Sequence, residues 1–208
     1  MLEALQVIHC PTEWVSPLIF TPEKAKDRAQ FKRLILPAGA DWFSLALYQG
    51  MHEYVLNGGL LITNSSLALA DENENQIIDK EDGTTPFPRE KFIGAWGGAW
   101  CSMGEVKVAQ ECPLSQGLPV GQWIRLAAPL AGRCTSLVTA EAALISNQIR
   151  KDHKPAEQPF LMYRQVGKGA CIYLAGEITS KHINDPTIAQ ILKNIFSSET
   201  LEWLCEWK

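Results

Sequence analysis

The sequence predicts an α/β fold whose sheet is mixed, with a parallel core and antiparallel additions. Two observations support this: a strand–helix–strand pattern over Phe31–Ser66, and a hairpin followed by an amphipathic helix over Phe160–Phe196. The 208 residues are 46% hydrophobic, which is enough for a full core.

The strand–helix–strand pattern is the clearest part of the chain. Leu34–Leu36 and Leu60–Thr63 are short apolar runs typical of strands buried on both faces. Between them, Ser44–Asn57 has helical spacing, with Leu47, Met51 and Val55 on one stripe. Gly58 and Gly59 then end the helix. We therefore expect two parallel strands joined by a helical crossover.

The loops that follow these strands predict where a ligand would bind. Open α/β sheets bind ligands at the carboxyl ends of their strands. Gly39–Trp42 follows the first strand and Asn64–Ser66 follows the second. We therefore expect Gly39, Asp41, Trp42 and Asn64 to contact a small molecule or a sugar.

The N-terminal part predicts a strand over Leu5–Cys10, which only residues 1–4 precede. Thr21-Pro22-Glu23 is a helix start, and this short polar helix should end near Gln30. We expect a single domain over residues 1–208. It either lacks the first strand and helix usual in such domains or is part of a longer chain.

The middle of the chain is less regular. Asp71–Pro88 is acidic and rich in turn formers, so we expect a long loop leaving the carboxyl edge. Phe92–Gly104 is a glycine- and tryptophan-rich loop in this interpretation. Further strands are expected over Val106–Val108, over Trp123–Leu126 and within Ser136–Ile149.

The C-terminal third predicts a hairpin and a helix. Phe160–Val166 and Ala170–Ala175 are apolar runs on either side of Gly167-Lys168-Gly169, which suits a tight turn. Asp185-Pro186 then begins the last long helix, whose apolar stripe should pack on the sheet.

Charge and cysteine usage narrow the function classes. The net charge is −4 and there is no basic stripe, so we expect no nucleic-acid partner. No apolar run is long enough for a membrane span. The six cysteines are scattered without CxxC pairs, and the N-terminus lacks a basic region. We expect a reduced, cytoplasmic protein with no metal and no cofactor.

Four segments, taken together, resemble a known superfamily. They are LILPAG at 34–39, EYVLNGGLLIT at 53–63, PLSQGLP at 113–119 and YRQVGKGACIYLAGE at 163–177. Their order and spacing resemble the class I glutamine amidotransferase-like superfamily. Within it, the chain is most similar to the trimerisation domain of bacterial beta-galactosidases and to ThuA-like proteins. The resemblance implies a flavodoxin-like three-layer sandwich with a mostly parallel central sheet.

The chain departs from the catalytic members of that superfamily. Those enzymes carry a cysteine nucleophile in a G-x-C-x-G elbow after a strand, and a histidine and glutamate two residues apart near the last strand. Here the strand leads into Asn64-Ser65-Ser66, without cysteine or glycine, and Glu177 and His182 are five residues apart. Amidotransferase chemistry is not expected.

One catalytic hypothesis remains open. Ser65 or Ser66 would be the nucleophile, His182 the base, and Glu177 or Asp185 the group that orients the base. In the alternative, the serines cap the turn that follows them and Asp185 caps the last helix. Two further hypotheses concern other residues: Trp42, Trp96, Trp100 and Trp123 as stacking platforms for a sugar, and Cys101 as a reactive thiol.

We therefore expect a non-catalytic binding or assembly domain of unknown ligand. The resemblance links it to carbohydrate metabolism and implies self-association or contact with a neighbouring glycosidase domain. The rival is a hydrolase of a small ester, amide or sugar derivative that uses Ser65 or Ser66 with His182.

Overall fold

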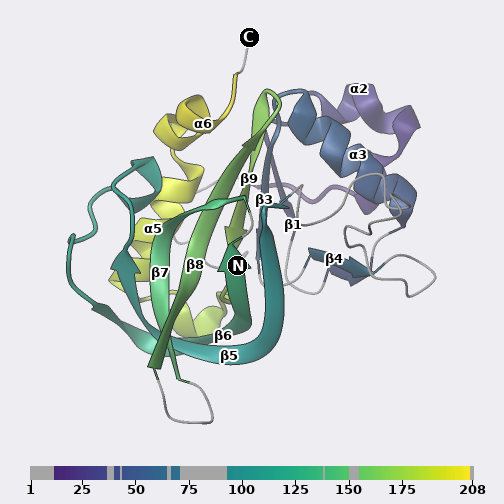
Figure 1. Ribbon diagram of the computed structural model, residues 1–208. Coiled ribbons are helices and arrows are strands. Elements are labelled where there is room, and N and C mark those ends of the chain that lie inside the picture. The colour runs from purple at the N-terminus through teal and green to yellow at the C-terminus, as the bar shows by residue number, and fades with distance from the viewer. Residues whose placement is uncertain are drawn as a thin grey trace.

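The fold is mixed α/β and is built on a curled seven-stranded sheet (Figure 1). The computed structural model describes residues 12–36, 40–42, 44–64, 67–70, 93–137, 139–149 and 155–206. The predicted strand Leu5–Cys10 and the predicted loop Asp71–Pro88 lie outside these residues.

The large sheet has the strand order β1-β3-β9-β8-β7-β5-β6, and a second sheet pairs β2 with β4. The strands are β1 (Arg33–Leu36), β2 (Ala40–Trp42), β3 (Leu60–Asn64), β4 (Leu67–Ala70), β5 (Ala95–Val108), β6 (Ile124–Leu137), β7 (Glu141–Ile149), β8 (Pro155–Val166) and β9 (Gly169–Leu174). The helices are α2 (Ala25–Arg28), α3 (Leu45–Leu56), α5 (Pro186–Phe196) and α6 (Ser198–Leu204). Short 3-10 turns are η1 (Pro17–Phe20), η2 (Pro22–Lys24), η3 (Pro113–Ser115) and η4 (Ser180–His182).

The predicted strand–helix–strand unit is confirmed as β1, α3 and β3. Ser44 caps α3 by accepting a hydrogen bond from Leu47 N at 3.3 Å, and Asn57 is the C-cap. β3 pairs in parallel with β1 on one side and with β9 on the other. These three strands therefore end at the same edge of the sheet.

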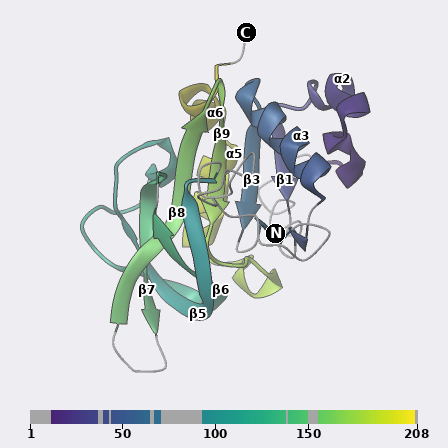
Figure 2. The ribbon, with the colours of Figure 1, turned by 45° about the vertical axis from the view of Figure 1, so that its right-hand side comes forward.

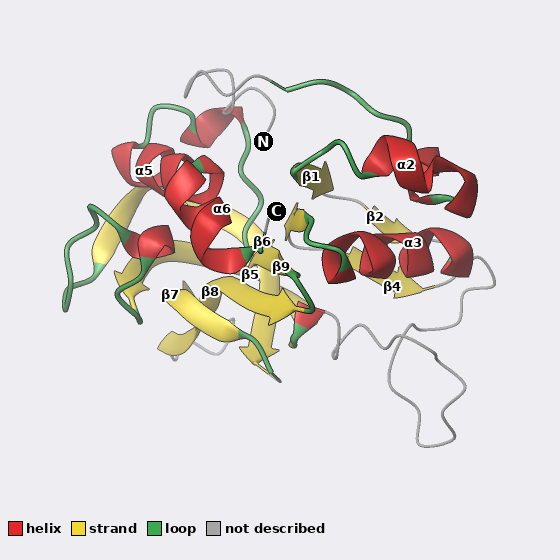
Figure 3. Ribbon diagram, turned by 90° about the horizontal axis from the view of Figure 1, so that it is seen from above, coloured by secondary structure: helices red, strands yellow, loops and turns green. Residues whose placement is uncertain are grey.

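Helices cover both faces of the parallel strands. Figure 3 shows α3 on one side of β9, and α5 and α6 on the other. The apolar stripe predicted for the last helix is confirmed, because Ile188, Ile191 and Ile195 of α5 are buried. The sheet between the layers is so well covered that every residue of β9 is buried.

The expectation of a mostly parallel sheet is wrong for the described strands. The pairs β1–β3 and β3–β9 are parallel, whereas β9–β8, β8–β7, β7–β5 and β5–β6 are antiparallel. The connections at 150–154 and 167–168 are too short for a helical crossover, so the neighbouring strands they join must run antiparallel. Figure 2 separates β1 and β3, beside α3, from the antiparallel strands β5, β6 and β7.

The expected loop at Phe92–Gly104 is also wrong in large part. Ala95–Val108 forms one strand, β5, which pairs with both β6 and β7. Its register shifts between Gly97 and Trp100 and again between Met103 and Glu105. Such irregularities bend a strand, and β5 curves visibly beneath the sheet (Figure 1).

This curvature brings β6 back to the chain that follows β9. Arg133 N donates to Ala175 O at 3.0 Å, and Glu177 N donates to Ala131 O at 2.7 Å. Between these bonds, Gly132 and Gly176 form an antiparallel bridge. The antiparallel strands therefore close on themselves as a barrel does.

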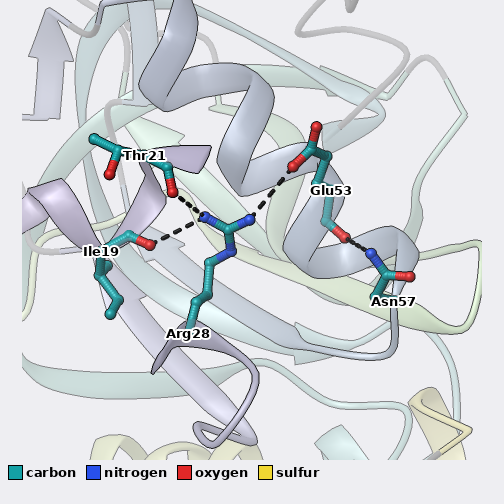
Figure 4. Close-up of polar contacts among 5 residues, drawn as sticks. All are labelled: Ile19, Thr21, Arg28, Glu53 and Asn57. Carbon is teal, nitrogen blue, oxygen red and sulfur yellow. Dashed lines mark hydrogen bonds and ion pairs between the residues drawn. The ribbon is translucent and has the colours of Figure 1, made fainter. Parts of the chain in front are cut away.

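Arg28 links the segment before β1 to α3 through hydrogen bonds and an ion pair. This side chain is 3% exposed, and its Nη1 donates to the carbonyls of Ile19 and Thr21 (Figure 4). Its Nη2 lies 3.4 Å from Glu53 Oε2 on α3. One buried guanidinium therefore holds η1, α2 and α3 together.

We predict that Gly132→Ala opens the barrel closure. An added Cβ would lie 2.1 Å from Ala175 O and 2.8 Å from Gly176 Cα, and backbone atoms cannot move aside cheaply. The free energy of unfolding should fall by about 2 kcal/mol, as expected for overpacking, measured by urea denaturation.

Gly104→Ala in β5 is the matched control, because nothing lies within 4 Å of its added Cβ. It should change the stability by no more than about 0.5 kcal/mol. Equal losses in the two variants would show that the close approach at Gly132 is unimportant.

Candidate functional site

The carboxyl edge of β1, β3 and β9 is the candidate site. Asn64 ends β3 beside Leu174, the last residue of β9. Beyond β1 and β3, the strands β2 and β4 pair in parallel, with Ala40 opposite Leu67 and Trp42 opposite Ala70. The backbones at Asp41, Trp42 and Asn64 therefore lie in the strands at or beyond this edge.

Three of the predicted site residues, Gly39, Ser65 and Ser66, lie outside the described residues. Glu177 is described and is half-buried. It follows β9 and reaches β6 through the hydrogen bond from its own backbone N to Ala131 O.

His182, the predicted base, is 3% exposed and uses both ring nitrogens within the protein. Thr179 N donates to Nδ1 at 3.0 Å, and the Thr179 hydroxyl lies 3.1 Å from the same nitrogen. Because Nδ1 accepts, the ring proton belongs on Nε2, which lies 3.2 Å from Pro129 O and donates to it. The imidazole thus links η4 to β6.

Asp185 caps α5, the last long helix, as the capping interpretation predicted. Its Oδ1 accepts from Thr187 N at 2.8 Å and from Ile188 N at 3.1 Å. Its Oδ2 accepts from Ala127 N on β6. The carboxylate therefore serves a helix start and a strand at the same time.

Sequence reasoning missed Thr63. Its side chain is 0% exposed, and its hydroxyl has no hydrogen-bond partner among the residues that the structure describes. It lies one residue before Asn64, between Leu36 of β1 and Tyr173 of β9. A buried hydroxyl without a partner costs about 1–3 kcal/mol, which makes it a candidate for a role other than stability. A threonine is ordinary in a strand, so the sequence contains no signal for it.

The thiols fall into two groups. Cys171 is the buried strand thiol that the sequence predicted, and burial raises its pKa well above the ordinary value. Burial likewise raises the pKa of Cys205 to about 11. Cys101 lies in β5 rather than in a loop, and Gln158 Nε2 donates to its sulfur at 3.3 Å.

Two of the four tryptophans considered as sugar platforms have described side chains. Trp100 is 52% exposed, and the Arg133 guanidinium lies 4.9 Å from its ring centre. Trp123 is half-buried, with Lys107 Nζ 5.7 Å from its ring centre. Each ring already contacts a cation of the same chain.

The described part of the chain contains neither a group of metal ligands nor a membrane-spanning helix. No three histidine, cysteine or acidic side chains gather there as metal ligands. None of the helices described is long and apolar enough to cross a membrane.

We predict that Thr63→Val leaves the fold intact or stabilises it by about 1 kcal/mol, because a methyl group replaces a hydroxyl that has no partner in the described part of the chain. Thermal unfolding measures the change. Thr135→Val is the matched control: this buried hydroxyl donates to Arg133 O at 2.9 Å, so its loss should destabilise by about 1 kcal/mol. A destabilised Thr63→Val would mean that the hydroxyl has a structural partner after all.

Comparison with known proteins yields structural matches only. No protein-family model matches the chain, and no curated protein sequence does. The beta-galactosidase of Rahnella sp. R3 matches with a TM-score of 0.63 at 13% identity, over 92% of this chain and 25% of that one. The beta-galactosidase of Bacillus circulans matches with 0.59 at 16%, over 92% and 26%. This chain therefore spans about a quarter of those enzymes.

Two smaller proteins match over most of their own length. A putative ThuA-like protein from Bacteroides uniformis has a TM-score of 0.62 at 15% identity, over 88% of this chain and 74% of that one. A cytoplasmic protein from Salmonella typhimurium has 0.57 at 13%, over 99% and 86%. At these identities the likeness concerns the fold alone. The resemblance inferred from the sequence motifs is confirmed at that level: the chain has the class I glutamine amidotransferase-like fold.

Proposed function

We propose that this chain is a non-catalytic binding or assembly domain. The observation that carries the proposal is the bonding of His182, whose two ring nitrogens are used by Thr179 and Pro129. A general base must offer a free ring nitrogen to the group it deprotonates. His182, which the sequence predicted as the base that activates a nucleophile, therefore has a structural role instead.

The structural likeness supports an assembly role of the same kind. The matching region is only a part of each larger beta-galactosidase chain. We infer that this domain associates with itself or with a neighbouring glycosidase domain, and that its parallel core is a flavodoxin-like sandwich. The proposed location is the cytoplasm, where scattered cysteines stay reduced.

The proposed ligand is a sugar or another small molecule at the carboxyl edge. Gly39, Asp41, Trp42 and Asn64 would contact it, with the indole against an apolar ring face and the carboxylate on hydroxyl groups. The position of β2 and β4 beyond β1 and β3 supports this placement.

The rival function is a hydrolase that uses Ser65 or Ser66 with His182 and Glu177. The register of β3 with β9, which sets Asn64 beside Leu174, favours keeping it as a second candidate. The serines follow one of these strands and Glu177 follows the other, so the two segments begin at one edge.

We predict that Ser65→Ala/Ser66→Ala hydrolyses p-nitrophenyl acetate at the wild-type rate, because neither serine is an activated nucleophile in this proposal. The measurement is the initial rate at pH 7.5, with melting temperatures recorded for both proteins. A loss of roughly tenfold or more at an unchanged melting temperature would overturn the non-catalytic proposal and favour the hydrolase.

We predict that galactose changes the tryptophan fluorescence of the wild-type chain and that Trp42→Phe removes most of this change. Trp14→Phe is the matched control, because Trp14 is a highly exposed tryptophan in the N-terminal segment. A response that survives in Trp42→Phe and disappears in Trp14→Phe would rule out the proposed sugar site.

A further inference from the structure

β6 is the last strand of the large sheet, so one of its edges faces away from β5. An open edge of this kind is a template for pairing with another chain. Proteins usually protect such edges with charged side chains or proline; Ala127–Gly132 has no charged residue and one proline, Pro129. Its side chains at Ala127, Pro129 and Ala131 are small and exposed.

At every second residue from Ala127 to Arg133, one backbone group of β6 is nevertheless hydrogen-bonded to the chain that follows β9. Ala127 N donates to Asp185 Oδ2, and Pro129 O accepts from His182 Nε2. Ala131 O accepts from Glu177 N, and Arg133 N donates to Ala175 O. These bonds involve every second residue, as expected where backbone groups point alternately toward the two sides of a strand.

All four partners come from one stretch, Ala175–Asp185, which we call the strap. Its first part bonds through the backbone, as a short strand would. Its second part leaves the edge to form η4 and to start α5, so only the side chains of His182 and Asp185 reach back to β6.

We propose that the strap closes the edge of β6, and that Asp185 is a positioning residue that keeps this edge from pairing with β6 of a second copy. A second copy fits best as the occupant because two identical edges can pair antiparallel about a two-fold axis. Each N–H and C=O that the strap now satisfies would then find its counterpart on the other copy.

Asp185→Asn tests this without removing the helix cap. Asparagine is as good an N-cap as aspartate, so its carbonyl can still accept from Thr187 N and Ile188 N. Its amide group, however, sets a donor against the N–H of Ala127. The edge contact is lost while α5 keeps its start.

The expected result has two parts. Hydrogen exchange at the Ala127 amide should become roughly tenfold faster, as for a lost hydrogen bond. Light scattering after size exclusion should give the Asp185→Asn variant twice the mass of the wild-type protein, and the share of this species should rise with protein concentration. Circular dichroism should show unchanged helix content. If Asp185→Asn is insoluble, Asp185→Ser takes its place. Serine keeps one oxygen to cap α5 but has no second oxygen to accept from Ala127 N, so the same changes in exchange and mass are expected.

Asp185→Asn/Ala127→Pro is the matched control. Proline removes the N–H in question, so position 127 can no longer donate a hydrogen bond to a second copy. This double variant should return to the wild-type mass.

Three outcomes would overturn the proposal. An Ala127 amide that exchanges no faster in Asp185→Asn would show that Asp185 does not hold the edge. Faster exchange without any change in mass would show that the open edge does not pair. A doubled mass that persists in the double variant would show that association occurs elsewhere.

Discussion

The requirement that every backbone group of a long edge strand find a partner shapes much of this molecule. β6 has fourteen residues and ends the sheet. Its edge is satisfied by the chain after β9, which in turn fixes where that chain can go. The Asp185 carboxylate joins Ala127 of β6 to the first turn of α5, so closing the sheet also places the helix that covers it. One carboxylate therefore couples two layers of the fold.

The parts of the fold that the sequence predicted are those set by local physics. Ser44 and Asp185 cap helices because their short oxygens reach the first free N–H groups. Gly167 adopts a positive φ of 64° in the β8–β9 turn, as the Gly-Lys-Gly motif indicated. The shared edge of β1 and β3 was also predictable, since a helical crossover between parallel strands leaves little choice.

The features of the fold that the sequence did not predict depend on partners that are distant in the sequence. Ala95–Gly104 lacks the alternation of a half-buried strand, and it becomes β5 only because β6 and β7 pair with it on either side. The curvature of β5 depends on register shifts that no local sequence pattern predicts. The role of His182 could not be predicted either, because Pro129, whose carbonyl oxygen accepts a hydrogen bond from Nε2, is 53 residues away in the sequence. A histidine near the end of the last strand suits catalysis and edge closure equally well.

The contrast between His182 and Thr63 indicates where a function should be sought. Buried polar groups that contribute to a fold are normally paired, and His182 and Asp185 follow this rule with every contact inside the chain. Thr63 breaks it, at the end of the strand that leads into Asn64. A Cβ added to Gly59, the residue before β3, would meet the Tyr54 ring of α3, and side chains two and four residues on share that face. The unpaired hydroxyl therefore lies on the α3 side of the sheet, away from the strap, which makes that side the better place to look for a ligand.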